Sequence, residues 1–510
     1  MILYGIETEY GISRETPGPD YDVVAESIAL VRAATQSGVR MRWDYSCEDP
    51  HVDARGFRVE ALRQDTDEAN YFAQDAARPL SFSEIKSDLA LKNGARFYND
   101  HAHPEYCTPE CRKIADLVKQ DQLGDRLVME CAEALTTKTT DREEGRVRLY
   151  KNNTDFQGHS YGCHENYLLP RDLAWENVSE GMRAFLATRQ IFCGAGKFGW
   201  EDEDRYIGPG FQISQRSDFF SVMESVDTMQ QRPLINTRDE PHADPEAWRR
   251  FHVIVGDANM SPYSTYLKVG STAAVLAMLN NVDPTRIPQL DDPVGTMREI
   301  SRDPTWSWAC HLTDGSPTTA IEVQRQYLAL VREALPEPED GFALVNWKKI
   351  LDDLETRPET TADRLDWTAK LDIVSKFRDA ENLGDEDPWL MSLDLSYHLL
   401  DESEGLYYGL RDQGQFRLPP GVTTTKENGF PPPTDTRAHV RGLCVQRFGQ
   451  HVEAAQWDHV RLRDETASLE LDLRRLFAPA AVAAAVAIIE RAQHVADLSP
   501  LPFAKPYKSV

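Results

Sequence analysis

Hydrophobic and polar residues alternate along several short segments in the first half of the chain. The segments are residues 2–13, 96–98 and 160–167, and residues 251–258 form a nearly continuous apolar run. A period of two is typical of strands with one packed face. In the first segment this period places Glu7 and Glu9 on the same side of the strand. The pattern predicts a sheet that packs on one face and carries carboxylates on the other.

Apolar residues with helical spacing dominate much of the remaining chain. They predict helices near residues 23–37, 114–136 and 265–279, and a mainly helical region from about 283 to 421. Residues 418–435 (LPPGVTTTKENGFPPPTD) then form a stretch rich in Pro, Gly and Thr, which is typical of a linker. We therefore expect a large domain over residues 1–425 and a small C-terminal domain over residues 426–510.

The C-terminal segment combines both kinds of pattern. We predict strands at residues 438–448, 459–463 and 468–473, followed by an Ala-rich helix that begins at Pro479. Together with the first half of the chain, this predicts an α+β fold: an antiparallel β-sheet cradle packed by helices, and a small C-terminal α+β domain.

A long polar region with weak periodicity covers residues 41–92. We predict from it a polar loop inserted at about residues 45–85. Its densest part, residues 64–75, is rich in Asp, Glu, Gln and Asn. Long connections of this kind are usually functional or disordered. A lid over a substrate site and plain disorder both fit this composition.

Charge and cysteine usage narrow the function classes. The net charge of −27 over 510 residues argues against general nucleic-acid binding and against docking on anionic membranes. The longest apolar run, residues 478–489, is too short to span a bilayer. The eight cysteines are scattered without a CxxC pair, which is typical of a cytoplasmic protein with free thiols. The sequence contains no Walker A motif and no GxGxxG fingerprint.

The segment NGARFYNDHAHPEYC concentrates groups that carry chemistry. Asp100, His101, His103 and Glu105 fall within six positions, with Pro104 among them. The segment is either a polar turn or a catalytic and metal-binding strand end, since buried acids need counter-charges or a metal. Oxygen ligands from paired acids suit Mg²⁺.

Other segments add candidate ligands and cations. His164 is either a metal ligand or a hydrogen-bonded core histidine. Arg216 and Arg238 follow apolar strands, where they either hold phosphates or form ion pairs with neighbouring acids. Carboxylates on several strands, with arginines nearby, would form a cradle for Mg²⁺ and a nucleotide. This is the design of a carboxylate–amine ligase of the glutamine-synthetase kind, or of a hydrolase built on the same cradle.

Several motifs together closely resemble one family. They are GIETEYG, NGARFYNDHAHPEY, YKNN, SYGCHENY, SQRSD, INTRDEPHAD, RFHVIVGDAN and PTDTRA. They resemble the Pup ligase and depupylase family, where Pup is the prokaryotic ubiquitin-like protein. The resemblance implies a glutamine-synthetase-like large domain with a small C-terminal domain. It also implies Pup or a Pup-like modifier and pupylated proteins as partners, and Mg²⁺ with ATP or ADP as cofactors.

The family has a ligase branch and a depupylase branch, and the motifs divide between them. The step from Asp100 to Glu105, the long polar region and FPPPTDTRA resemble depupylases. GIETEYG, NNTD, SYGCHENY and TPEC look slightly ligase-like. The insertion and the spacing favour an ATP- and Mg²⁺-dependent amidohydrolase that cleaves the isopeptide bond between a Pup-like modifier and a substrate lysine. It would also deamidate a C-terminal glutamine of Pup. The alternative is the ligase reaction through a γ-glutamyl phosphate.

The resemblance also implies roles for individual residues. The implied metal ligands are Glu7, Tyr98 and Glu105, joined by Glu9 and His164, with His242 as a weaker candidate. The implied nucleotide contacts are Arg96, Thr108 and Trp457, and Arg216 and Arg238 are the candidates for phosphate binding. Asp100 matches the catalytic aspartate, as base or as nucleophile. We expect its pKa to be lowered by Arg96 and a bound Mg²⁺.

Overall fold

The computed structural model describes most of the chain. The described residues are 3–34, 38–40, 42–63, 76, 78–139, 145–202, 205–335, 341–423, 429 and 431–508. The acid- and amide-rich stretch 64–75, for which a lid was one interpretation, lies outside them. Within the described residues, no helix has the length and apolar character needed to cross a membrane.

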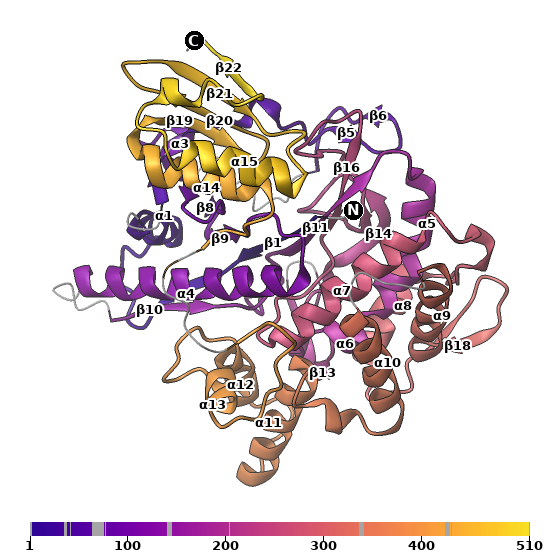
Figure 1. The fold of residues 1–510 in the computed structure, drawn as a ribbon. Coiled ribbons are helices and arrows are strands. Elements are labelled where there is room, and N and C mark those ends of the chain that lie inside the picture. The colour runs from indigo at the N-terminus through magenta and orange to yellow at the C-terminus, as the bar shows by residue number, and fades with distance from the viewer. Residues whose placement is uncertain are drawn as a thin grey trace.

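A seven-stranded antiparallel sheet forms the centre of the large domain (Figure 1). In spatial order its strands are β16 (Trp248–Val253), β11 (Cys163–Pro170), β1 (Tyr4–Glu9), β9 (His103–Cys107), β8 (Arg96–Asp100), β7 (Leu89–Leu91) and β3 (Gly38–Arg40). Every neighbouring pair is antiparallel. The predicted antiparallel cradle is therefore confirmed.

The alternation of β1 determines what each face of the sheet carries. Tyr4, Ile6 and Thr8 are buried, whereas Glu7 and Glu9 on the opposite face are partly exposed. The segment predicted as one strand over residues 2–13 is in fact two, because the chain leaves the sheet at Tyr10 and continues as β2 (Gly11–Arg14), which pairs with β10 (Val147–Tyr150).

Helices cover the apolar face of the sheet. They are α4 (Ile114–Thr139), α5 (Trp175–Thr188), α6 (Gln190–Cys193) and α7 (Pro262–Met278), with α1 (Val23–Ala33) packed near β8 and β9 (Figure 1). One continuous core joins buried residues of β1 and β11 to those of α5 and α7. This side of the sheet is fully packed, so the polar chemistry of the strands is confined to the other side.

Two-stranded sheets border the central one. They are β12 (Lys197–Asp202) with β13 (Arg205–Gln212), β14 (Phe220–Ser225) with β15 (Arg232–Asn236), β17 (Ala309–His311) with β18 (Pro317–Thr319), and β5 (Val52–Asp53) with β6 (Phe57–Arg58). The mainly helical region is present as predicted. It contains α8 (Pro293–Arg302), α9 (Ala320–Ala334), α10 (Gly341–Thr356), α11 (Asp366–Glu381), α12 (Pro388–Tyr397) and α13 (Leu406–Asp412).

The C-terminal segment packs α14 (Arg437–Phe448) and α15 (Pro479–Ile489) against a five-stranded sheet. The strand order is β22 (Ala504–Pro506), β21 (Ser468–Asp472), β20 (His459–Arg463), β19 (Val452–Gln456) and β4 (Arg42–Trp43). Because β4 comes from the polar region near the N-terminus, that region reaches from the large domain into the C-terminal sheet.

The strand predicted at residues 438–448 is wrong, because these residues form the helix α14. Val440, Cys444 and Phe448 are buried in one core with spacing of four residues, which suits a helix face and not a strand. Arg437 and Arg441, also four residues apart, both bind Glu110 of the large domain. The helix thus uses one face for the small core and another for docking.

Candidate active site

Strand register gathers acids from three neighbouring strands. Glu9 on β1 lies opposite Glu105 on β9, and Glu105 lies opposite Tyr98 on β8. Asp100 ends β8, and ligand oxygens of Glu9, Asp100 and Glu105 all lie within 4.8 Å of one another. Burial raises the pKa of Glu105 well above its usual range, and the charges of Asp100, Glu9 and Glu7 add to this. This group is called the acid cluster below.

A second group of ligands surrounds Glu7. Its carboxylate lies 3.4 Å from Nδ1 of His164 and 3.6 Å from Nε2 of His252. Within the described structure, both ring nitrogens of the buried His252 lack a hydrogen-bond partner. Burial and the nearby Arg250 lower the pKa of His252 to about 3, so its ring is neutral at pH 7. Neutral imidazoles with unused nitrogens are the form in which histidine binds a metal.

The two groups offer different donor atoms and therefore suit different divalent cations. The acid cluster offers only oxygen atoms, the donors that Mg²⁺ prefers. The group of Glu7, His164 and His252 adds nitrogen donors, which also suit transition metals. The sequence analysis does not single out His252, which lies inside the apolar run 251–258, or Arg250, which lies just before that run. Arg250 and His252 are two residues apart on β16, so they lie on the same face of the strand. This spacing was the sequence signal that could have identified them.

Asp100 is held by neighbours other than those expected. Although burial opposes ionisation, Lys86 and His101 lower the pKa of Asp100 well below its usual range. Arg96 does not supply this charge: its guanidinium binds Asp88 at 2.6 and 2.9 Å and lies 3.8 Å from the centre of the Tyr98 ring. The expected lowering of the Asp100 pKa is confirmed. The positive charge comes from Lys86 and not, as expected, from Arg96.

One hollow opens beside the Glu7 side of β1. Thr108 and Trp457 line it together with Glu7, His242 and Arg437. The Thr108 hydroxyl accepts a hydrogen bond from the Ile6 amide, and this bond fixes the hydroxyl at the wall. Trp457 comes from the turn between β19 and β20 of the C-terminal segment. This hollow therefore brings Thr108 and Trp457, two of the three expected nucleotide contacts, to one place.

The third expected contact, Arg96, lies in an aromatic cage near the same hollow. Its guanidinium is 4.1 Å from the centre of the Trp43 ring, and Trp43 packs edge-on against Trp457 at 5.4 Å. Tyr45 accepts a hydrogen bond from Arg96 at 2.7 Å. Residues of the polar region near the N-terminus therefore form part of the wall around the expected nucleotide contacts.

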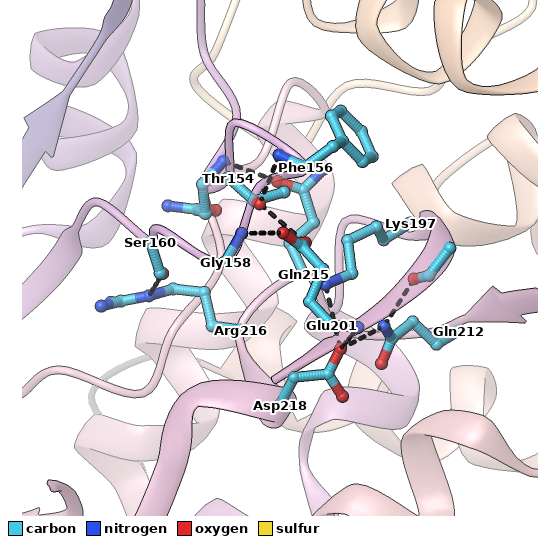
Figure 2. A network of polar contacts seen from close by, with 12 residues as sticks. Thr154, Phe156, Gly158, Ser160, Lys197, Glu201, Gln212, Gln215, Arg216 and Asp218 are labelled. Carbon is cyan, nitrogen blue, oxygen red and sulfur yellow. Dashed lines mark hydrogen bonds and ion pairs between the residues drawn. The ribbon is translucent and has the colours of Figure 1, made fainter. Parts of the chain in front are cut away.

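A larger groove opens on the other side of the acids. Asp100, Glu9, His164 and Arg216 all line it. Arg216 is buried, and its Nε donates a 3.2 Å hydrogen bond to Ser160 (Figure 2). Burial, with a contribution from nearby Arg232, lowers the pKa of Arg216 to about 10, which leaves it charged at neutral pH.

A buried polar network supports one wall of this groove. Glu201 accepts hydrogen bonds from the Gly158 amide at 2.9 Å and from the Thr154 hydroxyl at 2.7 Å (Figure 2). Lys197 donates to Glu201 at 2.8 Å and to Asp218 at 3.0 Å. Because residues 154–156 and 158–160 line the groove, Glu201 sets the shape of its wall without lining it.

Arg238 is placed differently from Arg216. It lines neither of the two hollows; its Nε lies 3.9 Å from Glu240, and it donates to the Val226 carbonyl at 3.3 Å. His242 lines the first hollow, outside both ligand groups, and burial lowers its pKa to about 3. His103 packs on the ring of Tyr161 at 4.5 Å and has Glu9 at 3.4 Å, which gives it a place in the groove wall.

Comparisons with known proteins show which family this chain resembles in sequence and in fold. Residues 2–461 match the family model of the Pup-ligase protein. The depupylase of Acidothermus cellulolyticus is 42% identical over 480 residues, which cover 90% of each chain. A crystal structure of the complex between Pup and its ligase PafA aligns with a TM-score of 0.73 and 28% identity, and covers 98% of this chain and 95% of that chain. The structure of PafA in complex with ADP gives a TM-score of 0.70, 31% identity, and coverage of 85% and 97%.

Proposed function

This chain belongs to the Pup-ligase protein family, and we propose that within this family it is a depupylase. It would use ATP and Mg²⁺ to hydrolyse the isopeptide bond between the C-terminal glutamate side chain of Pup and a substrate lysine. The same reaction on a primary amide would deamidate a C-terminal glutamine of Pup. The identity of 42% to a depupylase over 90% of this chain, against 38% to a Pup–protein ligase over 84% of it, supports this branch.

One observation carries the proposal: the face of β1 that carries Glu7 and Glu9 borders two hollows. Glu7 lines the hollow that contains Thr108 and Trp457, and Glu9 lines the groove that contains Asp100. A nucleotide on one side and an amide on the other would therefore share the acids between them. The relative that is 31% identical binds ADP, which supports a nucleotide in the first hollow.

The side chains of the groove account for amide hydrolysis. Asp100 is ionised and partly exposed, so its carboxylate is available either to attack the amide carbonyl or to take a proton from an attacking water. Arg216, charged and buried in the groove wall, would stabilise the oxyanion that forms on the carbonyl. If Asp100 acts as the base, the lysine amine leaves with the proton that Asp100 took from water, as the C–N bond breaks and the carbonyl re-forms. If Asp100 acts as the nucleophile, the amine leaves with a proton from solvent, and water then hydrolyses the anhydride and restores the Asp100 carboxylate.

The acid cluster and the group around Glu7 would hold the metal ions. When bound, Mg²⁺ would supply positive charge that polarises phosphate or carbonyl oxygens. Glu9 and Glu105 would hold one ion, Glu7 and His164 another, and Tyr98 would lie beside the first. Thr108, Trp457 and Arg96 would hold the nucleotide, with Arg238 nearby as a further cation.

The test is a pair of assays on the purified protein with ATP and Mg²⁺. In the first, a conjugate of Pup with a fluorescently labelled protein should lose its Pup. In the second, free Pup ending in glutamate and a lysine-bearing target should not become joined. Omission of ATP or addition of EDTA should stop the first reaction. Conjugate formation without release would instead identify the ligase, the alternative that shares this cradle.

A further inference from the structure

Lys86 contacts the carboxylate to which the chemistry is assigned. Its Nζ lies 2.5 Å from Oδ1 of Asp100, and the two side chains are 17% and 25% exposed. Asp100 lines the groove, whereas Lys86 lies outside its lining. The ammonium therefore engages one oxygen of a carboxylate that lines the groove. The reaction proposed above assigns no role to this lysine.

Lys86 is delivered by an anchored element. It is the last residue of α3 (Phe82–Lys86). The guanidinium of Arg32 on α1 donates to the Glu84 carbonyl at 2.9 Å and to the Ser87 hydroxyl at 3.0 Å. Asn99, next to Asp100 on β8, donates to the Ile85 carbonyl at 3.2 Å. The backbone on both sides of the ion pair is fixed, so the pair is not a loose surface contact.

The surroundings explain why Asp100 needs such a partner. Its carboxylate lies within 4.8 Å of those of Glu9 and Glu105, so by distance alone it belongs to the acid cluster. A divalent cation in this cluster would attract Asp100 as a third oxygen ligand. A carboxylate bound to a cation is a weaker base and nucleophile, because its lone pairs are engaged.

We propose that Lys86 is a positioning residue that holds the Asp100 carboxylate away from the cation site of Glu9 and Glu105. The ion pair engages Oδ1, which also has Nδ1 of His101 at 3.4 Å. This inference rests on the proposed function in one respect, the role of Asp100 in amide hydrolysis. Its effect on cation binding does not depend on that role.

The test is a double-mutant cycle on Mg²⁺ affinity with the full chain. The variants are Lys86→Met, Asp100→Asn and the double variant, titrated with MgCl₂ by calorimetry without substrate. If the charges act only through space, Asp100→Asn weakens Mg²⁺ binding by the same factor with and without Lys86. We expect a factor at least five times larger in the Lys86→Met background, because only there is Asp100 recruited as a ligand. Equal factors would overturn the proposal.

Kinetics provide an independent readout on conjugate cleavage. Lys86→Met should lower kcat about 100-fold and change KM less than threefold, because a displaced reacting group costs rate and not substrate binding. Lys86→Arg keeps the charge and should recover at least tenfold of the loss. Lys92→Met removes an exposed lysine from the turn between β7 and β8 and should change neither quantity. An unchanged kcat in Lys86→Met would count against the proposal.

The two readouts separate failure of this inference from failure of the proposed function. If the wild-type protein released no Pup but the cycle showed coupling, the depupylase assignment would fail and the positioning by Lys86 would stand. If the wild-type protein released Pup but the cycle were additive, only the positioning would fail. Thermal unfolding of each variant without Mg²⁺ verifies that the folded state is retained.

Discussion

Glu9 and Glu105 face each other across neighbouring strands, as direct partners in the antiparallel pair of β1 and β9. Glu105 is only 3% exposed, and Asp100 lies within the same cluster. Burial of several like charges costs free energy unless a cation or a proton offsets them. The pKa of Glu105 is raised because the ionised carboxylate bears this cost. The metal-free site is therefore less stable than a neutral one of the same shape.

Replacement of Glu105 by Gln should stabilise the metal-free protein. Because the folded-state pKa of Glu105 is raised, its contribution to stability is lost as the pH rises above the unfolded value, near 4.5. In EDTA we expect Glu105→Gln to raise the free energy of unfolding by about 1 kcal/mol at pH 8 and by less at pH 5. Added Mg²⁺ should raise the melting temperature of the wild type more than that of the variant, which keeps only the group around Glu7 intact.

Differential scanning fluorimetry at both pH values checks this prediction. Glu60→Gln, which changes an exposed acid, is the matched control and should behave as the wild type. Equal stabilisation at pH 5 and pH 8, or a full response to Mg²⁺ in Glu105→Gln, would contradict it.

Asp100→Asn should abolish the release of Pup and retain the binding of ATP. The amide side chain has almost the same shape but can neither attack a carbonyl nor accept a proton at neutral pH. Release of Pup should fall by about 10²–10⁴-fold, whereas ATP affinity should stay within about twofold, because Asp100 lies in the groove and not in the hollow of Trp457. Release at the wild-type rate would refute the assignment of Asp100.

Trp457→Ala should weaken nucleotide binding. Trp457 lines the first hollow and packs against Trp43, so the loss of its ring removes a stacking surface and loosens the cage around Arg96. Loss of an aromatic stacking contact costs about 1–3 kcal/mol, so the Kd for ATP should rise about 5- to 150-fold. Trp389→Ala, at a ring that is 65% exposed, should leave the Kd unchanged. Titration calorimetry with a non-hydrolysable ATP analogue measures both.

Glu110 should stabilise the docking of the C-terminal domain in a pH-dependent manner. Burial alone would raise its pKa, but Arg441 and Arg437 lower it to about 2. A lowered folded-state pKa means that the stabilisation is present above the unfolded pKa, near 4.5, and is lost as the pH falls toward 2. We expect Glu110→Gln to cost about 3 kcal/mol at pH 7 and much less at pH 3.

Calorimetric unfolding at the two pH values tests the role of Glu110. Glu490→Gln, at an exposed acid of the same domain, serves as the control and should cost nothing at either pH. A penalty for Glu110→Gln that did not shrink at pH 3 would show that the ion pairs with the two arginines do not carry the docking.

Much of the fold and the acid cluster follows from local pattern. Alternation in β1 is enough to put Glu7 and Glu9 on one face, and motif resemblance then connects them with Tyr98 and Glu105. Register is a tertiary property, so the contact of Glu7 with His164 could be expected but the one with His252 was missed. Lys86 lies in a polar region without periodicity, and only the packing of α3 against α1 and β8 brings it to Asp100.

The error at α14 has a similar origin. Its apolar residues recur at every fourth position, a helical signal, yet the segment was assigned to strands. The long-range partners of this helix decide its role: Arg437 and Arg441 bind Glu110, 327 and 331 residues away in sequence. No local pattern reports contacts at such separations. The contacts of α14 with Glu110 therefore depend on tertiary packing and could not be predicted from the local sequence.

Glu201→Gln should damage the groove and leave the nucleotide hollow intact. Oε1 of Glu201 accepts from the Gly158 amide, and Oε2 accepts from Thr154 and from Lys197 (Figure 2). A glutamine offers only one oxygen, so its NH₂ group must face either the Gly158 N–H or the Lys197 ammonium. Breaking a buried charged contact typically costs about 3–5 kcal/mol, and the local cost here falls on residues 154–160 of the groove wall.

A displaced wall should weaken binding of the Pup conjugate, because these residues line the groove that would receive it. We therefore expect KM to rise about tenfold in Glu201→Gln, by analogy with the loss of one good binding contact, with the Kd for ATP unchanged. Asp202→Asn is the matched control: it changes the next residue of β12, which forms an ion pair with the exposed Arg205 at 3.1 Å. An unchanged KM in Glu201→Gln, with normal folding, would mean that residues 154–160 do not contact the substrate.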